Sequence, residues 1–417
     1  MKQFLNLVLS VSLLFFSFQN NYPQNRKEYL SGADALLRFK PLLLRGKNIG
    51  VVANHTAILK NGTHLIDSLI HMKDVHIIKL FSPEHGIRGD AEAGASVKDG
   101  ADKKTGLKII SLYGKSFKPK KEDLKGINLI LFDIQDIGAR YYTYIATLYY
   151  VIEACAENNI PIFILDRPNP ISPVEPDGPV IVKGFSSPVS IAPLPIIHNM
   201  TIGEIGKYFN YLFEKEKGLH CHLMVIPMKG WNRNRFFDEY STNWVRPSPN
   251  ITSLETALIY PGTCLIEGTN ISEGRGTESP FLSIGAPFIK SSLLMDELNK
   301  HNIQGIAVEP FNFTPEDIPG TATNPKYKNE LCRGIKITIT DRKKIEPLKF
   351  GIALLYSLKK QFAEFKFKDK TIDMLFGNDF LRKMINAGEK PEKIYLKWQK
   401  ELNNFINLRN KFLLYNK

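Results

Sequence analysis

The stretch "FSPEHGIRGDAEAG", residues 81–94, concentrates ionisable groups on what the sequence predicts to be one loop after an apolar strand. Glu84 follows Pro83, and Gly86 permits tight backbone geometry directly after His85. A carboxyl group at a strand end, in a cleft partly shielded from water, is suited to act as a general acid. The alternative is a carboxylate that caps the next element.

Polar groups follow three further apolar runs in the same way. Asn54 and His55 follow the first run, Asp166 and Arg167 follow the last, and the third run ends in "FDIQDIGARYYTYI", residues 132–145. That third segment contains Asp133, Asp136, Arg140 and Tyr142. Aromatic rings beside paired polar groups are typical of a sugar-binding cleft, although helix capping and structural Asp–Arg pairs explain the same residues.

A second polar segment lies in the C-terminal half. The run "YPGTCLIEGTNISEGRGTESPF", residues 260–281, carries Asn270, Glu273 and Arg275 among four glycines. It matches neither a phosphate loop nor a dinucleotide fingerprint, because no GKS/T ending and no GxGxxG after a strand occur. We expect a binding loop that faces the first domain across a cleft.

The elements that must position these groups alternate between strands and helices. Apolar runs at 48–54, 75–83, 127–135 and 160–168 predict strands buried on both faces, and residues 141–159 predict a helix. This alternation indicates an α/β fold with a parallel sheet, in which ligands bind beyond the carboxyl ends of the strands.

The predicted division of the chain has three parts. Residues 1–20 resemble a secretory signal peptide, since an apolar run from Phe4 to Phe16 is too short to span a membrane. Residues 25–188 form the parallel-sheet domain, and residues 189–417 form a second domain that contains a helix capped by Thr201 and Glu204. The Pro- and Gly-rich residues 169–195 read as a linker or an extended crossover. We expect an exported protein, periplasmic or extracellular, without stable membrane insertion after signal removal.

The net charge indicates which partners to expect, and the cysteine spacing bears on metal sites and disulfides. The net charge of +13 comes from scattered lysines and arginines without a basic repeat, which argues against nucleic acid and suits anionic cell-wall material. The four cysteines show no CxxC spacing, so a structural zinc site is not expected, and one disulfide is left open. The oligomeric state is not readable from the sequence.

Two other chemistries receive little support from the sequence. His55, His85 and Asp133 end predicted strands and could converge on zinc, but no HExxH or HxH spacing exists, and we expect no metal. A serine nucleophile is not expected, since the GxSxG elbow is absent.

Six motifs in order carry a resemblance to a known family. They are "SPEHGIRGDAEAG", "LILFDIQDIGARYYTYI", "DRPNPI", "HNMTIGEI", "PSPNI" and "GTNISEGRGTESPF". Together they resemble the exo-β-N-acetylmuramidases of NamZ type, from about residue 30 to the C-terminus. The resemblance implies a Rossmann-like N-terminal domain, a smaller α+β C-terminal domain and an active site in the cleft between them. It also implies release of N-acetylmuramic acid (MurNAc) from the non-reducing end of peptidoglycan fragments such as MurNAc-β-1,4-GlcNAc. No cofactor is implied.

The resemblance places the family's proposed catalytic acid on Glu84. Glycoside hydrolysis needs a second group, for which the candidates are Asp133, Asp136, Glu92 and Glu273. Alternatively, the 2-acetamido group of the substrate attacks, and Asp133 or Asp136 orients it.

Substrate binding is expected from both domains. An arginine should pair with the lactyl carboxylate of MurNAc, and the candidates are Arg140, Arg167 and Arg275. The residues expected to bind substrate are Asn54, His55, His85, Arg140, Tyr142, Asp166, Arg167, Asn270, Glu273 and Arg275. Two rivals stay open: a non-catalytic receptor for wall sugars, and a metal-dependent hydrolase.

Overall fold

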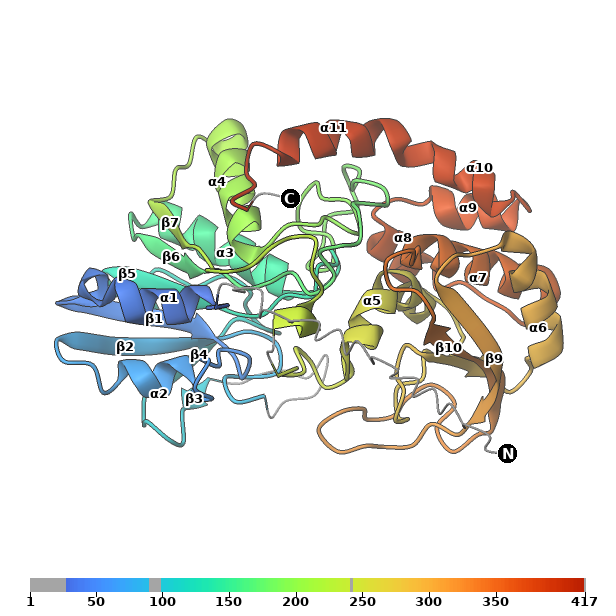
Figure 1. The fold of residues 1–417 in the computed structure, drawn as a ribbon, viewed down its shortest axis with the longest axis horizontal. Coiled ribbons are helices and arrows are strands. Elements are labelled where there is room, and N and C mark those ends of the chain that lie inside the picture. Colours follow the sequence, from blue (N-terminus) through green and yellow to red (C-terminus); the bar gives the residue numbers. More distant parts are fainter. Residues whose placement is uncertain (1–27, 90–98, 241–242, 416–417) are drawn as a thin grey trace, which may run out of the picture.

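A seven-stranded sheet forms the centre of the first domain. The computed structural model describes residues 28–89, 99–240 and 243–415, so the expected signal peptide and Glu92 lie outside the described residues (Figure 1). The strand order is β3-β4-β2-β1-β5-β6-β7, and every neighbouring pair is parallel except β3 with β4. The strands are β1 (Lys47–Ala53), β2 (Val75–Ser82), β3 (Gly100–Ala101), β4 (Lys108–Ser111), β5 (Leu129–Asp133), β6 (Ile162–Leu165) and β7 (Leu223–Ile226). The α/β fold with a parallel sheet is confirmed.

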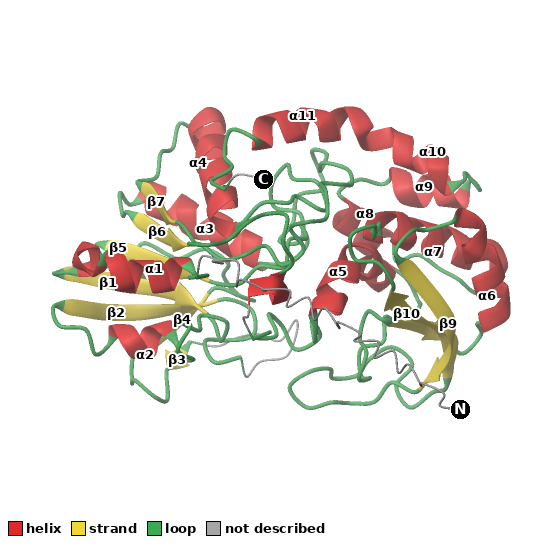
Figure 2. Ribbon diagram, viewed as in Figure 1, coloured by secondary structure: helices red, strands yellow, loops and turns green. Residues whose placement is uncertain are grey.

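Helices cover both faces of this sheet because its strands are apolar on both sides (Figure 2). In β5, Ile130 and Phe132 belong to the core that α3 (Tyr144–Glu157) and α4 (Ile202–Lys217) share. Leu129 and Leu131 alternate with them and join the core of α1 (Gly32–Phe39) and α2 (Leu65–Leu69).

The first domain extends beyond residue 188, where the sequence analysis ended it. β7 pairs in parallel with β6, and α4 packs on this sheet, so both elements belong to the first domain. The reason is that the Pro- and Gly-rich residues 169–195 form a crossover between β6 and α4. The predicted capping of α4 is present: the Thr201 hydroxyl accepts from the Glu204 amide, and the Glu204 carboxylate accepts from the Thr201 amide.

The second domain is a small antiparallel sheet covered by helices. Its strand order is β8-β10-β9, formed by β8 (Ser283–Ala286), β9 (Ile306–Phe313) and β10 (Cys332–Ile339). The helices are α5 (Leu254–Thr263), α6 (Ser291–Leu298), α7 (Pro347–Gln361), α8 (Asp369–Phe376), α9 (Phe380–Asn386), α10 (Pro391–Tyr395) and α11 (Gln399–Arg409). The smaller α+β domain is therefore also confirmed.

The C-terminal segment returns to the first domain. Helix α11 runs from the second domain toward α4, where the chain ends (Figure 1). The Tyr415 hydroxyl donates to Asp166 Oδ2 at 2.6 Å and accepts from the Met228 amide at 2.9 Å. The Leu414 amide donates to Glu204 Oε1 at 2.8 Å. The last residues thus complete hydrogen bonds of buried acids in the first domain.

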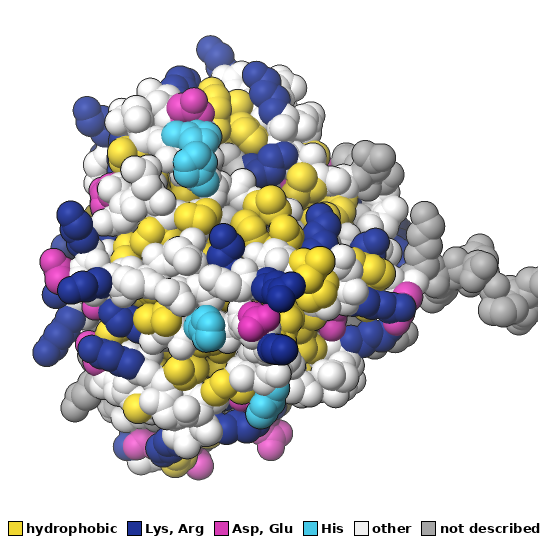
Figure 3. Space-filling view, turned by 90° about the vertical axis from the view of Figure 1, so that its left-hand side faces the viewer, with side chains coloured by type: hydrophobic (Ala, Val, Ile, Leu, Met, Phe, Trp, Pro, Cys, Tyr) yellow, Lys and Arg dark blue, Asp and Glu magenta, His cyan; other side chains and the backbone are white. Residues whose placement is uncertain are grey.

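Figure 3 shows the face of the first domain that is turned away from the second. Lysine and arginine side chains are spread over this face, with acidic, histidine and hydrophobic side chains between them. Within the described ranges, no helix has the length and apolar content that crossing a bilayer requires. All four cysteines are buried free thiols.

Candidate active site

Glu84 lies on a strained turn at the carboxyl end of β2. The strand ends at Ser82, and His85 and Gly86 both adopt left-handed backbone conformations, with φ of 73° and 82°. Such a conformation costs a non-glycine residue about 1–3 kcal/mol and is often found at functional sites. The turn leaves Glu84 partly exposed, and its Oε2 accepts a 2.6 Å hydrogen bond from the Thr143 hydroxyl.

A third residue, Tyr113, lies beside the same carboxylate. Burial and the neighbouring Glu84 raise the pKa of the Tyr113 phenol, so this hydroxyl keeps its proton. Thr143 immediately precedes α3, whereas Tyr113 follows β4. Two elements distant in sequence therefore fix Glu84.

An ion pair anchors the segment that follows Glu84. Arg88 donates from Nε and Nη2 to the two carboxylate oxygens of Asp102, at 3.0 and 2.8 Å, and from Nη2 to Asp67 at 3.0 Å. The hydrogen bond from Arg88 lowers the pKa of Asp102 to about 2. A Cβ on Gly89 would lie 2.7 Å from the His55 ring, so this position needs glycine. These contacts fix the turn against α2, the residue after β3 and the residues that follow β1.

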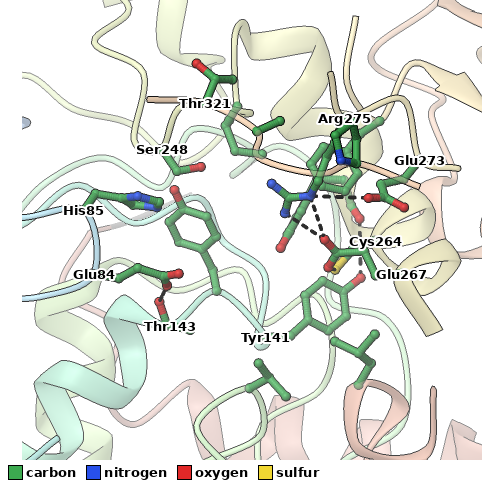
Figure 4. Close-up of a pocket in the computed structure, with 18 of the residues that line it drawn as sticks. Glu84, His85, Tyr141, Thr143, Ser248, Cys264, Glu267, Glu273, Arg275 and Thr321 are labelled. Carbon is green, nitrogen blue, oxygen red and sulfur yellow. Dashed lines mark hydrogen bonds and ion pairs between the residues drawn. The ribbon is translucent and has the colours of Figure 1, made fainter. Parts of the chain in front are cut away.

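A cavity of about 650 Å³ lies between the two domains and is lined by Glu84. In Figure 4, Glu84 and Thr143 lie on one side of the pocket, and Arg275, Glu267 and Glu273 lie on the other. The first domain contributes Glu84, His85, Tyr113, Tyr141, Tyr142, Thr143 and Tyr144. The segment from Val189 onward contributes Val189, Ser248, Ile251, Tyr260, Cys264, Glu267, Glu273, Arg275, Phe281, Thr321, Ala322, Thr323, Asn324, Pro325, Lys326 and Leu375.

Tyrosine rings form one wall of this cavity. Tyr142 packs edge to face against Tyr144 and Tyr260, with ring centroids 5.0 and 6.0 Å apart. The Tyr144 hydroxyl donates to the Pro247 carbonyl at 2.6 Å. The buried Tyr142 hydroxyl lies near Ser248 and has no hydrogen bond of normal geometry within the described part of the chain.

The opposite side of the cavity carries two cations and two acids. Arg275 donates from Nε and Nη2 to Glu267 Oε1, at 3.1 and 2.7 Å, and lies 3.4 Å from Glu273 Oε1. Lys326 donates to Glu273 Oε2 at 2.9 Å. Against the effect of burial, Glu267 and Glu273 hold the pKa of Arg275 above its ordinary value. This cluster brings positive groups suited to a carboxylate to the cavity surface.

Asp133 and Arg167 lie outside the cavity and pair with each other. Arg167 Nε and Nη2 donate to the two oxygens of Asp133, at 2.5 and 2.9 Å, and both side chains are buried. This pair joins the carboxyl ends of β5 and β6. The sequence left open a sugar-binding role or a structural Asp–Arg pair for these residues, and the observed geometry is that of the structural pair.

Asp136 also lies outside the cavity. Its Oδ2 accepts from the Gly138 amide at 2.8 Å and lies 3.7 Å from Nε2 of the buried His198. Burial raises the pKa of Asp136 to about 7 and lowers the pKa of His198 to about 3. The carboxyl group thus keeps its proton at pH 5, where an ordinary aspartate is ionised.

Arg140 connects the two domains from a fully buried position. Its Nη1 donates to the carbonyls of Pro179 and Leu194, at 2.6 and 2.9 Å, and Nη2 donates to the Leu375 carbonyl at 2.9 Å. Asp166 is buried as well, and burial raises its pKa to about 7. Its oxygens accept from Thr201, Gly203 and Tyr415. Neither residue reaches the cavity.

Three further residues that were predicted to bind substrate make hydrogen bonds outside the cavity. Asn54 Oδ1 accepts from the amide and hydroxyl of Thr56, which closes the turn after β1. His55 Nε2 lies 2.7 Å from the Arg246 carbonyl, and burial lowers the pKa of His55. Asn270 joins the backbone of residues 364 and 366 inside the second domain.

The structure therefore separates the predicted residues into two groups. Glu84, His85, Tyr142, Glu273 and Arg275 line the cavity. The other strand-end groups hold the domain together, because they bond one another or the backbone. Within the residues described, no group of three His, Cys, Asp or Glu side chains is placed to hold a metal ion.

The sequence analysis assigned no role to Thr143, Tyr113, Glu267 or Lys326. Thr143 and Glu267 stand inside the quoted stretches 132–145 and 260–281, so their position was a usable signal. Nothing near Tyr113 or Lys326 in the sequence marks either residue, because each reaches the cavity from a different part of the fold.

In this α/β domain, a glutamate at a strand end faces a cavity with a wall of tyrosines. Carboxylates and an arginine lie across the cavity. This is the arrangement of a glycosidase whose site lies between two domains. The comparisons with known proteins agree. The family model described as "Exo-beta-N-acetylmuramidase NamZ, N-terminal" matches residues 49–255, and the model of the C-terminal domain of the same family matches residues 258–415. The chain belongs to the NamZ family of exo-β-N-acetylmuramidases and is a glycosidase.

Relatives support this assignment over nearly the whole chain. The peptidoglycan beta-N-acetylmuramidase NamZ of Bacillus subtilis is 40% identical over 397 residues, which is 95% of this chain and 93% of the relative. Two crystal structures of DUF1343 family proteins from Bacteroides fragilis share the fold. One has a TM-score of 0.84 at 30% identity, covering 93% of this chain and 99% of that one. The other has a TM-score of 0.74 at 32% identity, covering 94% and 99%.

Proposed function

We propose that this chain removes MurNAc from the non-reducing end of peptidoglycan fragments, such as MurNAc-β-1,4-GlcNAc, with Glu84 as the general acid. The observation that carries the proposal is the placement of Glu84. It lies on the cavity surface, held by Thr143 and Tyr113, opposite the Arg275 cluster. The family and the Bacillus relative support the substrate class.

Among the carboxylates that the structure describes, the geometry favours attack by the acetamido group of the substrate over attack by a second protein carboxylate. Asp133 and Asp136 are buried outside the cavity, and Glu267 and Glu273 are engaged by Arg275 and Lys326. Glu92 lies outside the described residues. In this route the acetamido oxygen bonds to C1 while the bond from C1 to the bridging oxygen breaks. Protonated Glu84 gives its proton to that oxygen, and the resulting carboxylate then takes a proton from the water that opens the cyclic intermediate.

Arg275 is our choice for the lactyl carboxylate of MurNAc. Of the three arginines that the sequence suggested, Arg140 and Arg167 lie outside the cavity, whereas Arg275 lines it, paired with Glu267 and Glu273. Its neighbour Lys326 adds a second positive charge. This pair should distinguish MurNAc from GlcNAc, which lacks the carboxylate.

The central test compares wild type with Glu84→Gln on MurNAc-GlcNAc. We expect kcat to fall by about 10²-fold or more, as is usual for loss of a general acid, while substrate binding measured by calorimetry persists. The exposed Glu122→Gln is the matched control and should leave both quantities unchanged. A wild-type protein that binds the disaccharide without releasing MurNAc would instead be a receptor. Loss of activity on exhaustive chelation would favour the metal-dependent alternative.

We further propose that the protein is exported and acts in cell-wall turnover, in the periplasm or outside the cell. The support is the apolar run at residues 4–16 and the wall-derived substrate. N-terminal sequencing of the protein recovered from its natural compartment tests this. A mature chain that still begins at Met1 in the cytoplasm would contradict it.

A further inference from the structure

An apolar groove of about 460 Å³ adjoins the cavity and has no role in the steps above. Its walls come from both domains. Tyr113, Phe117 and Val189 come from the first domain, and Met374 and Leu375 come from the second. All but Leu375 are partly exposed. Partly exposed apolar side chains gathered around one hollow are typical of a binding surface.

The groove borders the residues that hold the general acid. Tyr113 and Thr143, which hold Glu84, line both the cavity and the groove, as do Val189, Glu267 and Leu375. Glu84 and Arg275 themselves line the cavity only. A general acid gives its proton to the oxygen that joins two sugars, so it must stand between the sites that hold them. If the cavity holds the sugar that is released, the groove lies on the side of the sugar that leaves.

The chemistry of the groove suits a sugar ring. Phe117 packs edge to face against Tyr113, with ring centroids 5.6 Å apart, and its other neighbour Tyr150 lies at 6.2 Å. These contacts hold the ring in place before any ligand arrives, which lowers the entropy cost of stacking. A pyranose presents an apolar face of C–H groups to such a ring, while its hydroxyls need polar partners. Lys370 and Thr371 are exposed residues of the same groove and can supply them.

We propose that this groove is the leaving-group subsite: it binds the N-acetylhexosamine ring on the reducing side of the scissile bond, stacked on Phe117. The inference rests on the proposed function and adds the site of the second sugar. It explains how an enzyme that removes a single terminal sugar also recognises the glycan from which that sugar is cut.

The experiment compares two substrates that differ only on the leaving side, MurNAc-β-1,4-GlcNAc and methyl β-MurNAc. The quantity measured is the ratio of their kcat/KM values. Phe117→Ala should lower kcat/KM for the disaccharide by about tenfold, the worth of one aromatic contact with its buried area. It should leave kcat/KM for the methyl glycoside within about twofold of the wild-type value. Phe117→Trp should restore kcat/KM for the disaccharide. The matched control is Phe39→Ala, which removes another partly exposed ring remote from the groove.

A second measurement does not depend on turnover. Free GlcNAc should inhibit hydrolysis of methyl β-MurNAc, and Phe117→Ala should raise its inhibition constant by about tenfold. Met374→Ala, in the second domain, should act in the same direction with a smaller effect. It also provides the test if Phe117→Ala does not fold, which thermal unfolding would show.

The outcomes separate the two proposals. A wild-type protein that cleaves neither substrate overturns the proposed function. An active wild type in which Phe117→Ala lowers kcat/KM equally for both substrates, or for neither, overturns the leaving-group subsite and leaves the proposed function intact.

Discussion

Arg140 should be a structural residue whose loss lowers stability without changing substrate affinity. The sequence motif "GARYYTY" made it a candidate for binding the lactyl carboxylate. Instead, it is buried and donates to three carbonyls, two from the crossover at Pro179 and Leu194 and one from Leu375 in the second domain. Burial lowers its pKa to about 9, so the group is still charged at neutral pH.

The expected size follows from these contacts. In Arg140→Met, three buried carbonyls lose their partner, at about 1–3 kcal/mol each. The removal of a buried charge offsets part of this loss, because its desolvation costs several kcal/mol. We expect a net destabilisation of about 3 kcal/mol. For a chain of 417 residues this lowers Tm by about 3 to 4 °C.

The assay is thermal and urea unfolding followed by the fluorescence of the three tryptophans, together with KM for MurNAc-GlcNAc well below Tm. Arg140→Lys should also destabilise, since an ammonium group cannot serve three separated carbonyls as the planar fork does. An Arg140→Met protein with unchanged Tm and a KM raised tenfold or more would refute the reasoning. It would mean that this guanidinium reaches the substrate.

Three further outcomes follow from the same structure. Arg88→Gln frees the turn after Glu84 from Asp102, so kcat/KM should fall by about tenfold, and the urea midpoint should also fall because buried Asp102 loses its cation; an unchanged kcat/KM would exclude the anchoring role. Because folded Asp136 keeps a proton that the unfolded chain releases near pH 4, the stability that Asp136 contributes should be lost as pH rises from about 4 through 7. In urea unfolding, the free energy of unfolding of Asp136→Asn should therefore rise relative to that of wild type between pH 5 and pH 8, and a constant difference would contradict the raised pKa. Tyr415→Phe removes the hydrogen bonds to Asp166 and Met228 and should cost about 1–2 kcal/mol, measured by urea unfolding, whereas no loss would show that the C-terminal contact carries no stability.

Sequence patterns located the sheet because its signal is local. The apolar runs that became β1, β2, β5 and β6 are short, continuous and end in polar residues, and the capping residues Thr201 and Glu204 mark α4. The end of the first domain was harder to locate. Parallel pairing of β7 with β6 joins residues about sixty positions apart, and no local pattern reports such a partner.

The acids at the strand ends show where sequence reasoning stops. Glu84, Asp133 and Asp166 each follow an apolar run and look equivalent as letters. Only Glu84 reaches the cavity, since Asp133 meets Arg167 and Asp166 meets Tyr415 from the far end of the chain. The direction of each carboxyl depends on these distant partners, so the sequence could propose the set but could not rank its members.

The return of the chain to its first domain has a consequence for how the protein can be divided. Residues up to about 255 contain the whole seven-stranded sheet, yet Asp166 and Glu204 depend on Tyr415 and Leu414 for hydrogen bonds. The second domain is therefore topologically an insertion, attached at both ends to the same host. An isolated N-terminal fragment would leave Asp166 and Glu204 without these two partners, and a peptide of residues 399–415 supplied in trans would be its natural complement.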